Sequence, residues 1–467
     1  MFEKLANIFR IPELRRRVLF TLGLLAVYRL GAHIPTPGID AAALARLFES
    51  LRGTPLGLVD LFTGGQLSKL TIFALGITPY ITASIIFQLL TVVYEPLAKL
   101  QKEGELGRKK ITQWTRYLTV VLGAIQAFGI AITLEKGGFG AGERLVLTPG
   151  WGFRLTTMIT LAAGTAFIMW LGEQITERGI GNGMSLLIFA GIVVGLPRAS
   201  ADLWDKVYNN TWGALTLPAV VVLLIFMIAV IAFIVYTERS ERRVPMQFAT
   251  RMVGRRMVGG RQSYLPLRVN SGGVMPVIFA SSILSFPTFA GQYFKDSKVM
   301  APFFDALKYG EPMYTLMYAL GIIFFAYFYV SIVFSPKQVA DDMRRGGGFV
   351  PGIRPGARTE TYLNDILTRI TLVGAFYLIA ISLIPEWMLT GIKLNHLPWV
   401  FGPFFERALP AWFTNGLGVN FYFGGTSLLI VVGVAMDTAN QIESQLIMRH
   451  YEGFTPKSGR IRGRRNW

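Results

Sequence analysis

Residues 217–236 read LPAVVVLLIFMIAVIAFIVY, a stretch of the chain without one charged side chain. A helix of about 20 apolar residues is long enough to cross the ~30 Å hydrocarbon core of a bilayer. Comparable apolar runs recur along the 467 residues, of which 52% are hydrophobic and 16% are charged. A soluble domain has about 25% charged residues. The sequence therefore predicts an all-α integral membrane protein.

Ten apolar runs, separated by charged or turn-rich breaks, are candidate membrane spans. The fifth, ninth and tenth are short or interrupted, so each has the alternative of a re-entrant or buried segment. We expect ten transmembrane helices, at residues 18–34, 70–93, 117–134, 155–171, 180–196, 217–236, 274–294, 314–334, 366–384 and 421–436.

The basic residues indicate how these spans are oriented. Most of the 46 lysines and arginines fall in the two termini and in the loops after spans two, four, six and eight. The positive-inside rule places those segments, and so both termini, in the cytoplasm. Two groups of five spans would be inverted copies if they are repeats, and such halves often enclose a central pathway. We expect halves at 1–200 and 201–440, and a basic cytoplasmic tail at 441–467.

Ionisable groups are rare in the ten runs, where Arg29 and Arg369, each near one end of its run, are the formal charges. The chain has no cysteine and three scattered histidines, and it lacks the spacing patterns of nucleotide and zinc sites. Proton-coupled and ion-coupled transporters usually need intramembrane carboxylates, histidines or lysines. We therefore expect a passive conduit without cofactor, metal or enzymatic activity. The alternatives are a secondary transporter of a small solute and a membrane-embedded enzyme, which would need a nucleophile and a base inside the spans.

Five stretches carry a resemblance to a known family. They are GGQLSKLTIFALGITPYITASIIFQLL from Gly64, LGEQITERGIGNGMSLLIFAGI from Leu171, GGVMPVIFASSIL from Gly272, GGGFVPGIRPG from Gly346 and FGGTSLLIVVGVAMDTANQIESQLIMRHYEGF from Phe423. Their order and spacing resemble the SecY/Sec61-alpha family. The resemblance implies ten helices in two inverted halves around a central pore. It also implies a bacterial plasma-membrane channel that conducts unfolded polypeptides and releases hydrophobic segments into lipid. The implied partners are SecE, SecG, the SecA motor ATPase, the ribosome, preproteins with signal sequences, and the bilayer.

Pairs of isoleucines lie four residues apart in two of the resembling stretches, which puts each pair on one helix face. The alternative is that such side chains face lipid or a neighbouring helix. By resemblance, the family's pore ring falls on Ile77, Ile81, Ile188, Ile192, Ile278 and Ile430. An apolar constriction offers an ion no replacement for its hydration and tends to dewet.

Two movable parts are implied by the same resemblance. Residues 57–69, GLVDLFTGGQLSK, match the plug, with Gly64 and Gly65 as a flexible hinge; an ordinary external loop is the alternative. The lateral gate matches the second and seventh spans, whose uncharged polar residues include Thr82, Gln88, Ser281 and Ser282. Simple hydrogen bonding between helices is the alternative for these four.

Two cytoplasmic loops have the character of docking surfaces. The loop 237–270 contains many arginines and no lysine, and its sequence is compatible with a hairpin that Pro245 and Pro266 would restrict. The loop 335–365 presents Arg354 on a turn stiffened by proline. Guanidinium groups bind carboxylate or phosphate bidentately, and the alternative is that they fix topology and attract anionic lipid. The expected docking residues are Arg242, Arg243, Arg251, Arg255, Arg256 and Arg354.

Overall fold

The computed structural model describes most of the chain. Its described residues are 11–40, 43–44, 46–47, 64–135, 145–208, 216–248, 251–253, 256–258, 262–291, 301–307, 311–390 and 425–452. Residues 57–63 of the expected plug, Arg255, residues 391–424 and the tail beyond residue 452 lie outside the described residues.

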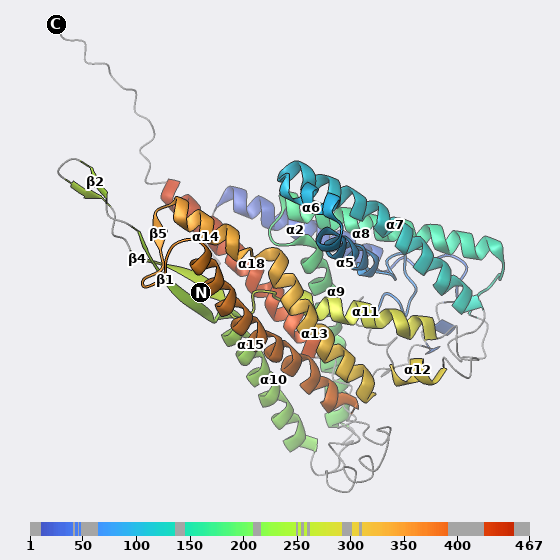
Figure 1. The fold of residues 1–467 in the computed structure, drawn as a ribbon. Coiled ribbons are helices and arrows are strands. Elements are labelled where there is room, and N and C mark those ends of the chain that lie inside the picture. Colours follow the sequence, from blue (N-terminus) through green and yellow to red (C-terminus); the bar gives the residue numbers. More distant parts are fainter. Residues whose placement is uncertain are drawn as a thin grey trace.

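Helices cover the five expected spans of the first half (Figure 1). They are α2 Pro12–Gly31, α5 Thr78–Val93, α7 Glu105–Glu135, α8 Trp151–Arg178 and α9 Gly183–Tyr208. The second span was expected to begin at residue 70, and that boundary is wrong. Residues 70–77 form turns, interrupted by a β-bridge between Thr71 and Pro35, and Leu70 and Gly76 have φ of 37° and 55°. The helix begins only at Thr78, beside Pro79, whose fixed φ suits a first helical turn.

The second half also has a helix at each expected position. They are α10 Thr216–Arg239, α11 Met275–Gly291, α13 Pro312–Val333, α15 Ala357–Thr390 and α18 Gly425–Glu452. Shorter helices are α6 Glu95–Lys102, α12 Ala301–Ala306 and α14 Pro336–Arg345. Within the described residues, four helical stretches are long and apolar enough to cross a membrane: 105–135, 151–178, 312–345 and 357–384. The pair α5 and α6, bent by 100°, makes a fifth if it counts as one span.

A small β-sheet departs from the all-helical expectation and confirms the hairpin expected in the loop 237–270. Strands β1 Glu241–Phe248 and β4 Gln262–Arg268 pair antiparallel, and β2 Arg251–Val253 pairs with β3 Arg256–Val258 beyond them. The short β5 Gly348–Phe349 pairs with the end of β1 only at residues 247 and 248. Pro245 therefore sits where β1 has one neighbour, which is where a strand tolerates a missing N–H.

The helices pack through small residues and turn large apolar ones outward. The buried face of α7 includes Thr115, Thr119, Gly123, Ala127 and Ala131, spaced by four. Large side chains elsewhere on this helix and on α10 are more than half exposed, among them Val121, Ile125, Val222, Ile225 and Ile228. Close contact through small residues is typical of helices packed in lipid, because lipid tails solvate large apolar side chains and burial of these side chains gains little free energy.

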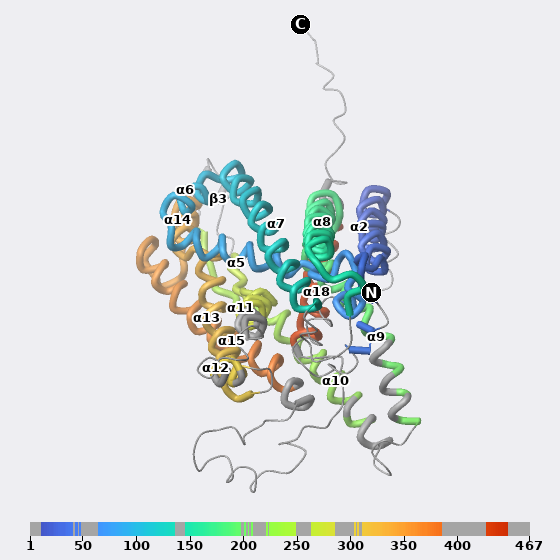
Figure 2. Tube along the Cα trace, turned by 90° about the vertical axis from the view of Figure 1, so that its right-hand side faces the viewer, coloured from blue at the N-terminus to red at the C-terminus, as the bar shows by residue number. Residues whose placement is uncertain are grey.

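Helices α11 and α18 lie in the middle of the bundle, between α13 and α15 on one side and α2 and α8 on the other (Figure 2). A buried apolar cluster joins the halves there. It combines residues of α2, α8 and α9 with Ile430 and Val434 of α18, and Ile278 of α11 packs against it. The centre of the bundle is therefore where the two halves meet.

Candidate functional site

All six isoleucines of the expected ring belong to this central cluster. Ile77, Ile192 and Ile430 are buried, with 7%, 2% and 2% of their surface exposed. The other three, Ile81, Ile188 and Ile278, are partly buried and pack against them. They come from the start of α5, from α9, from α11 and from α18, so both halves contribute.

Local geometry explains how the ring residues meet. Ile77 precedes α5, and the amide of Ile81 donates to its carbonyl at 3.0 Å, which starts the helix with both side chains on one face. Ile188 and Ile192 are one turn apart within α9. Branched aliphatic side chains offer no ligand to a hydrated ion. Among the residues that the structure describes, no group of three or more His, Cys, Asp and Glu could hold a metal.

The expected hinge lies against α9 beside the ring. Gly64 and Gly65 have φ of +73° and +78°, a backbone region that disfavours side chains. A Cβ on Gly64 would come 2.7 Å from the carbonyl oxygen of Gly191, the residue before Ile192. The next residue, Gln66, is buried, and its Nε2 donates to Tyr28 Oη of α2 at 2.7 Å. The chain after the hinge is thus fixed on the first span.

The polar residues expected at the gate hydrogen-bond within their own helices. Thr82 Oγ1 donates to the Thr78 carbonyl at 3.0 Å, Ser281 Oγ to the Ile278 carbonyl at 2.9 Å, and Gln88 Nε2 to Ser84 Oγ at 3.2 Å. Ser282 is partly buried on α11. Gln88 Oε1 is buried and has no hydrogen-bond partner in the described part of the chain.

The contact between α5 and α11 is largely apolar, which sequence reasoning missed by looking for polar residues. Ile85 of α5 shares a buried cluster with Val277 and Ala280 of α11, and Leu89 and Leu284 pack against it. The spacing of these residues by three, four and seven is the signal that could have found this face. An apolar contact of this kind can part into lipid without leaving unpaired polar groups.

The β-sheet joins the two loops that carry the expected docking arginines. Arg242 and Arg243 are exposed on β1, where Arg243 pairs with Glu241 at 2.7 Å. Arg354 is exposed on the turn that follows β5, and its carbonyl accepts a hydrogen bond from Thr359 at 2.9 Å. Pairing of β1 with β5 therefore joins the two expected docking loops. For Arg251 and Arg256 the main chain alone is described, in β2 and β3.

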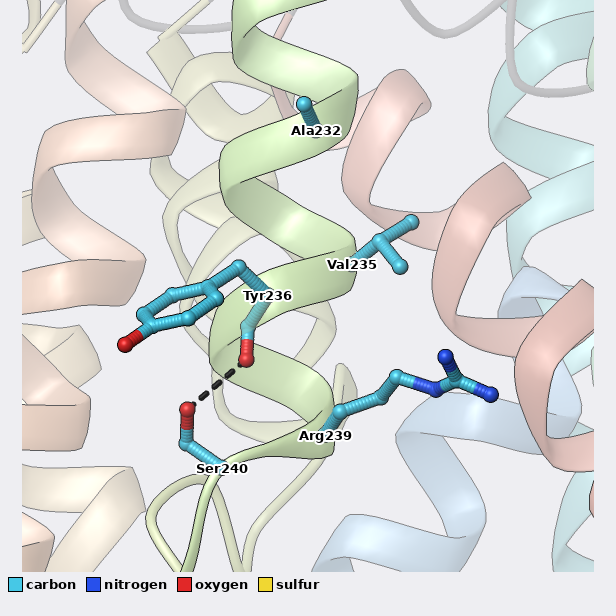
Figure 3. A pocket seen from close by; sticks show the side chains of 5 residues that line it. All are labelled: Ala232, Val235, Tyr236, Arg239 and Ser240. Atoms are coloured by element: carbon cyan, nitrogen blue, oxygen red, sulfur yellow. Dashed lines mark hydrogen bonds between the residues drawn. The ribbon is translucent and has the colours of Figure 1, made fainter.

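A pocket on the flank of α10 is lined by Ala232, Val235, Tyr236, Arg239 and Ser240 (Figure 3). Ser240 Oγ donates across it to the Tyr236 carbonyl at 2.7 Å. None of the six isoleucines lines this pocket, so it is separate from the candidate pore.

A family model described as SecY matches residues 71–439, which is most of the chain. The chain belongs to the SecY family. This SecY-family chain is 46% identical over 451 residues to the protein translocase subunit SecY of Escherichia coli K12, covering 96% of this chain and 95% of that one. It is 45% identical over 454 residues to the Vibrio cholerae subunit, with coverage of 96% and 95%. The Streptomyces galbus subunit is 44% identical over 464 residues, with coverage of 97% and 100%.

Solved structures share the fold. One described as a protein-conducting channel has a TM-score of 0.58 at 17% identity and covers 94% of both chains. A second, of a SecY protein whose plug domain stabilises the closed channel, has a TM-score of 0.59 at 18% identity and the same coverage. Canine Sec61 in a ribosome-channel complex has a TM-score of 0.55 at 17% identity, again with 94% coverage of both chains.

Proposed function

We propose that this SecY-family chain is the central channel-forming subunit of a protein translocase. It moves unfolded polypeptides across the membrane and releases hydrophobic segments laterally into lipid. The observation that carries the proposal is the meeting of six isoleucines from four helices of both halves. Relatives named as translocase subunits, at 43 to 46% identity over nearly the whole chain, support the same activity.

The central isoleucines act as a seal that a polypeptide can widen. Aliphatic side chains around a narrow path exclude water and ions, while their rotamers adjust to chains of different shape. A small-solute transporter would instead need a polar or charged midplane site. The apolar central cluster favours the channel over the transporter.

The lateral exit is the contact between α5 and α11, with Thr82, Gln88, Ser281 and Ser282 along its helices. Gly64 and Gly65 form the hinge of a plug that seats under the isoleucine ring. Both roles rest on the family and on positions: the hinge lies beside Ile192, and α5 and α11 each carry ring residues.

The arginine surface binds the cytosolic partner that delivers the polypeptide. Arg242, Arg243, Arg251, Arg255, Arg256 and Arg354 dock the ribosome or the SecA motor ATPase, whose phosphates and carboxylates match guanidinium geometry. SecE and SecG complete the complex in the bacterial plasma membrane, with both termini cytoplasmic. A solved relative of the same fold is described within a ribosome-channel complex, which supports the ribosome as partner.

A photo-crosslinking amino acid at Ile278 tests the pore directly. In membrane vesicles, a secretory chain stalled in transit should crosslink to Ile278. The matched control is Ile283 on the same helix, which is 43% exposed and turned away from the ring. Crosslinking that is equal at both positions, or stronger at Ile283, would contradict the assignment of Ile278 to the pore.

A swap of the docking arginines for lysine tests the guanidinium surface. Lysine keeps the charge but loses the planar fork, so affinity for the ribosome or for SecA should fall in a flotation assay. Unchanged affinity would leave only a general requirement for positive charge.

A further inference from the structure

The hairpin and the central helix α11 are joined by residues 269–274. The β1–β4 ladder ends with the pair Glu241 and Arg268. One further hydrogen bond follows, from the Val269 amide to the Ser240 carbonyl at 3.0 Å. The paired structure of the hairpin therefore extends to the end of α10, and a force on its strands reaches Val269 without a flexible linker between them.

Asn270, the next residue, makes two hydrogen bonds with one buried amide group. It is 6% exposed, and its Nδ2 donates to Glu238 Oε1 of α10 at 2.6 Å and to the Gly273 carbonyl at 3.1 Å. The first bond ties the junction to α10, and the second closes the turn that leads into α11. One side chain thus fixes both the place and the conformation of this junction.

Two other helices surround the same junction. A Cβ on Gly374 of α15 would lie 2.6 Å from the Val269 carbonyl oxygen and 3.7 Å from Asn270 Cα. A Cβ on Gly433 of α18 would lie 2.8 Å from the Val274 side chain. The start of α11 is therefore closely packed against α10, α15 and α18.

The hydrogen bond between Asn270 and Glu238 involves a carboxylate that depends on its donor. That carboxylate is half-buried, and burial raises the pKa of this carboxyl above its usual range, with a further contribution from the charge of Asp437. The hydrogen bond from Asn270 acts in the opposite direction. A carboxylate in this setting is costly to leave without its donor.

We infer that Asn270 is a positioning residue that holds the start of α11 on α10, and that its release from Glu238 lets movement of the hairpin shift α11. The inference deepens the proposed function and rests on it for the meaning of that shift. Ile278 lies in the first turns of α11, where its amide donates to the Val274 carbonyl at 3.2 Å. Val277 and Ala280 of the same turns belong to the buried cluster that also contains Ile85 of α5. A shift at Asn270 therefore changes both the ring and the lateral contact.

Exchange of the amide and the carboxylate between the two positions gives a sharp test. Asn270→Asp keeps the shape of the side chain but opposes two carboxylates. Glu238→Gln alone keeps an acceptor for Asn270. The double variant Glu238→Gln, Asn270→Asp restores a donor and an acceptor in reversed order. All are compared in the full chain, reconstituted in lipid at about pH 8, where sharing of a proton between two carboxylates is disfavoured.

Two measurements report on the link. The first is hydrogen exchange of the backbone amides of residues 270–280. The second is the rate at which a water-soluble maleimide labels an Ile278→Cys variant, which would carry the chain's one cysteine because the natural sequence has none. Both rates should rise by about tenfold or more in Asn270→Asp, the change expected for a lost hydrogen bond to a charged group. Both should fall back part of the way in the double variant, which restores the link to position 238 but not the hydrogen bond to the Gly273 carbonyl.

Asp437→Asn serves as the matched control. Asp437 contacts Arg268 at 3.8 Å in the same region, but both side chains are more than half exposed, so loss of this pair should change little. If Asn270→Asp fails to fold while the double variant folds, the pairing is again responsible.

Two results would overturn the inference. One is unchanged exchange in Asn270→Asp; the other is a double variant as disturbed as Asn270→Asp, which would mean that position 270 needs asparagine for another reason. Polypeptide transport is measured separately in the unmodified chain. A chain that conducts no polypeptide would contradict the proposed function, while hydrogen exchange would still decide on the link.

Discussion

Single residues in this chain act mainly by joining segments that are distant in sequence. Gln66 and Tyr28 are 38 residues apart, and Asn270 and Glu238 are 32 apart. No periodicity connects such partners, because each pair depends on how whole helices are placed. Sequence reasoning therefore singled out Gly64 and Gly65 but not the hydrogen bond of Gln66, and the arginines of the hairpin but not Asn270 at its base.

The Gln66–Tyr28 hydrogen bond should contribute measurably to stability because both side chains are nearly fully buried. We expect Gln66→Met and Tyr28→Phe each to lower the free energy of unfolding by about 1 kcal/mol. The double variant should lose less than the sum. Unfolding in mixed detergent micelles, followed by tryptophan fluorescence, would measure the coupling, and strict additivity would mean that the bond contributes nothing.

Glu238 should give the chain a distinct dependence of stability on pH. Burial raises the pKa of its carboxyl above the usual 4.5 in the folded chain. The folded state then holds a proton that the unfolded state has already released, so stability should decline as the pH rises from about 4.5 through the raised pKa. Glu238→Gln should flatten the unfolding free energy across that range. An identical slope in the variant would assign the effect to another group.

At the scale of elements, the apolar runs located a helix at every expected span. Spacing by four put Ile188 and Ile192 on one helix face, and the family resemblance predicted which faces meet. Prediction from apolar runs failed where apolar residues do not form helix. Residues 70–77 are as apolar as a membrane span, but they form turns instead of helix, and Leu70 and Phe73 are buried in the bundle. Apolar composition reports burial, whereas the start of α5 depends on Pro79 and on local backbone conformation.

The isoleucine ring should resist ions only while it stays apolar. In planar bilayers, Ile192→Asn and Ile278→Asn should raise the resting ion conductance by roughly tenfold or more, since an amide holds water in the constriction. Ile192→Val, which keeps the branched aliphatic shape, should remain tight. Equal conductance of the asparagine and valine variants would place the ion barrier elsewhere.

Two ion pairs link α7 and α8, one between Arg116 and Glu173 at 2.6 Å and one between Arg154 and Glu135 at 2.5 Å. The Glu135 side chain is 11% exposed, so Glu135→Gln should lower the unfolding free energy by on the order of 1–3 kcal/mol. The pair of Glu95 with Lys99 is an exposed control, with side chains 79% and 72% exposed. Its loss should matter by less than about 0.5 kcal/mol. Similar losses of unfolding free energy at both pairs would show that burial does not strengthen the pair of Glu135 with Arg154.

At the scale of the whole molecule, the distribution of lysine and arginine predicts which side of the membrane each loop faces. The hairpin after α10 should be cytoplasmic, and the connection between α7 and α8 should be external. Tyr264 is 55% exposed on β4, and Thr148 is exposed between α7 and α8. In intact cells, an impermeant maleimide should label Thr148→Cys from outside and should reach Tyr264→Cys only after the membrane is broken. The reverse pattern would invert the proposed topology.

The shared sheet has a mechanical meaning for the molecule as a whole. Strand β1 belongs to the loop between α10 and α11, whereas β5 belongs to the loop between α13 and α15. A partner that binds either loop therefore moves the same sheet, because β1 and β5 are hydrogen-bonded to each other. Cytosolic machines of different shape could then impose the same displacement on the interior of the bundle.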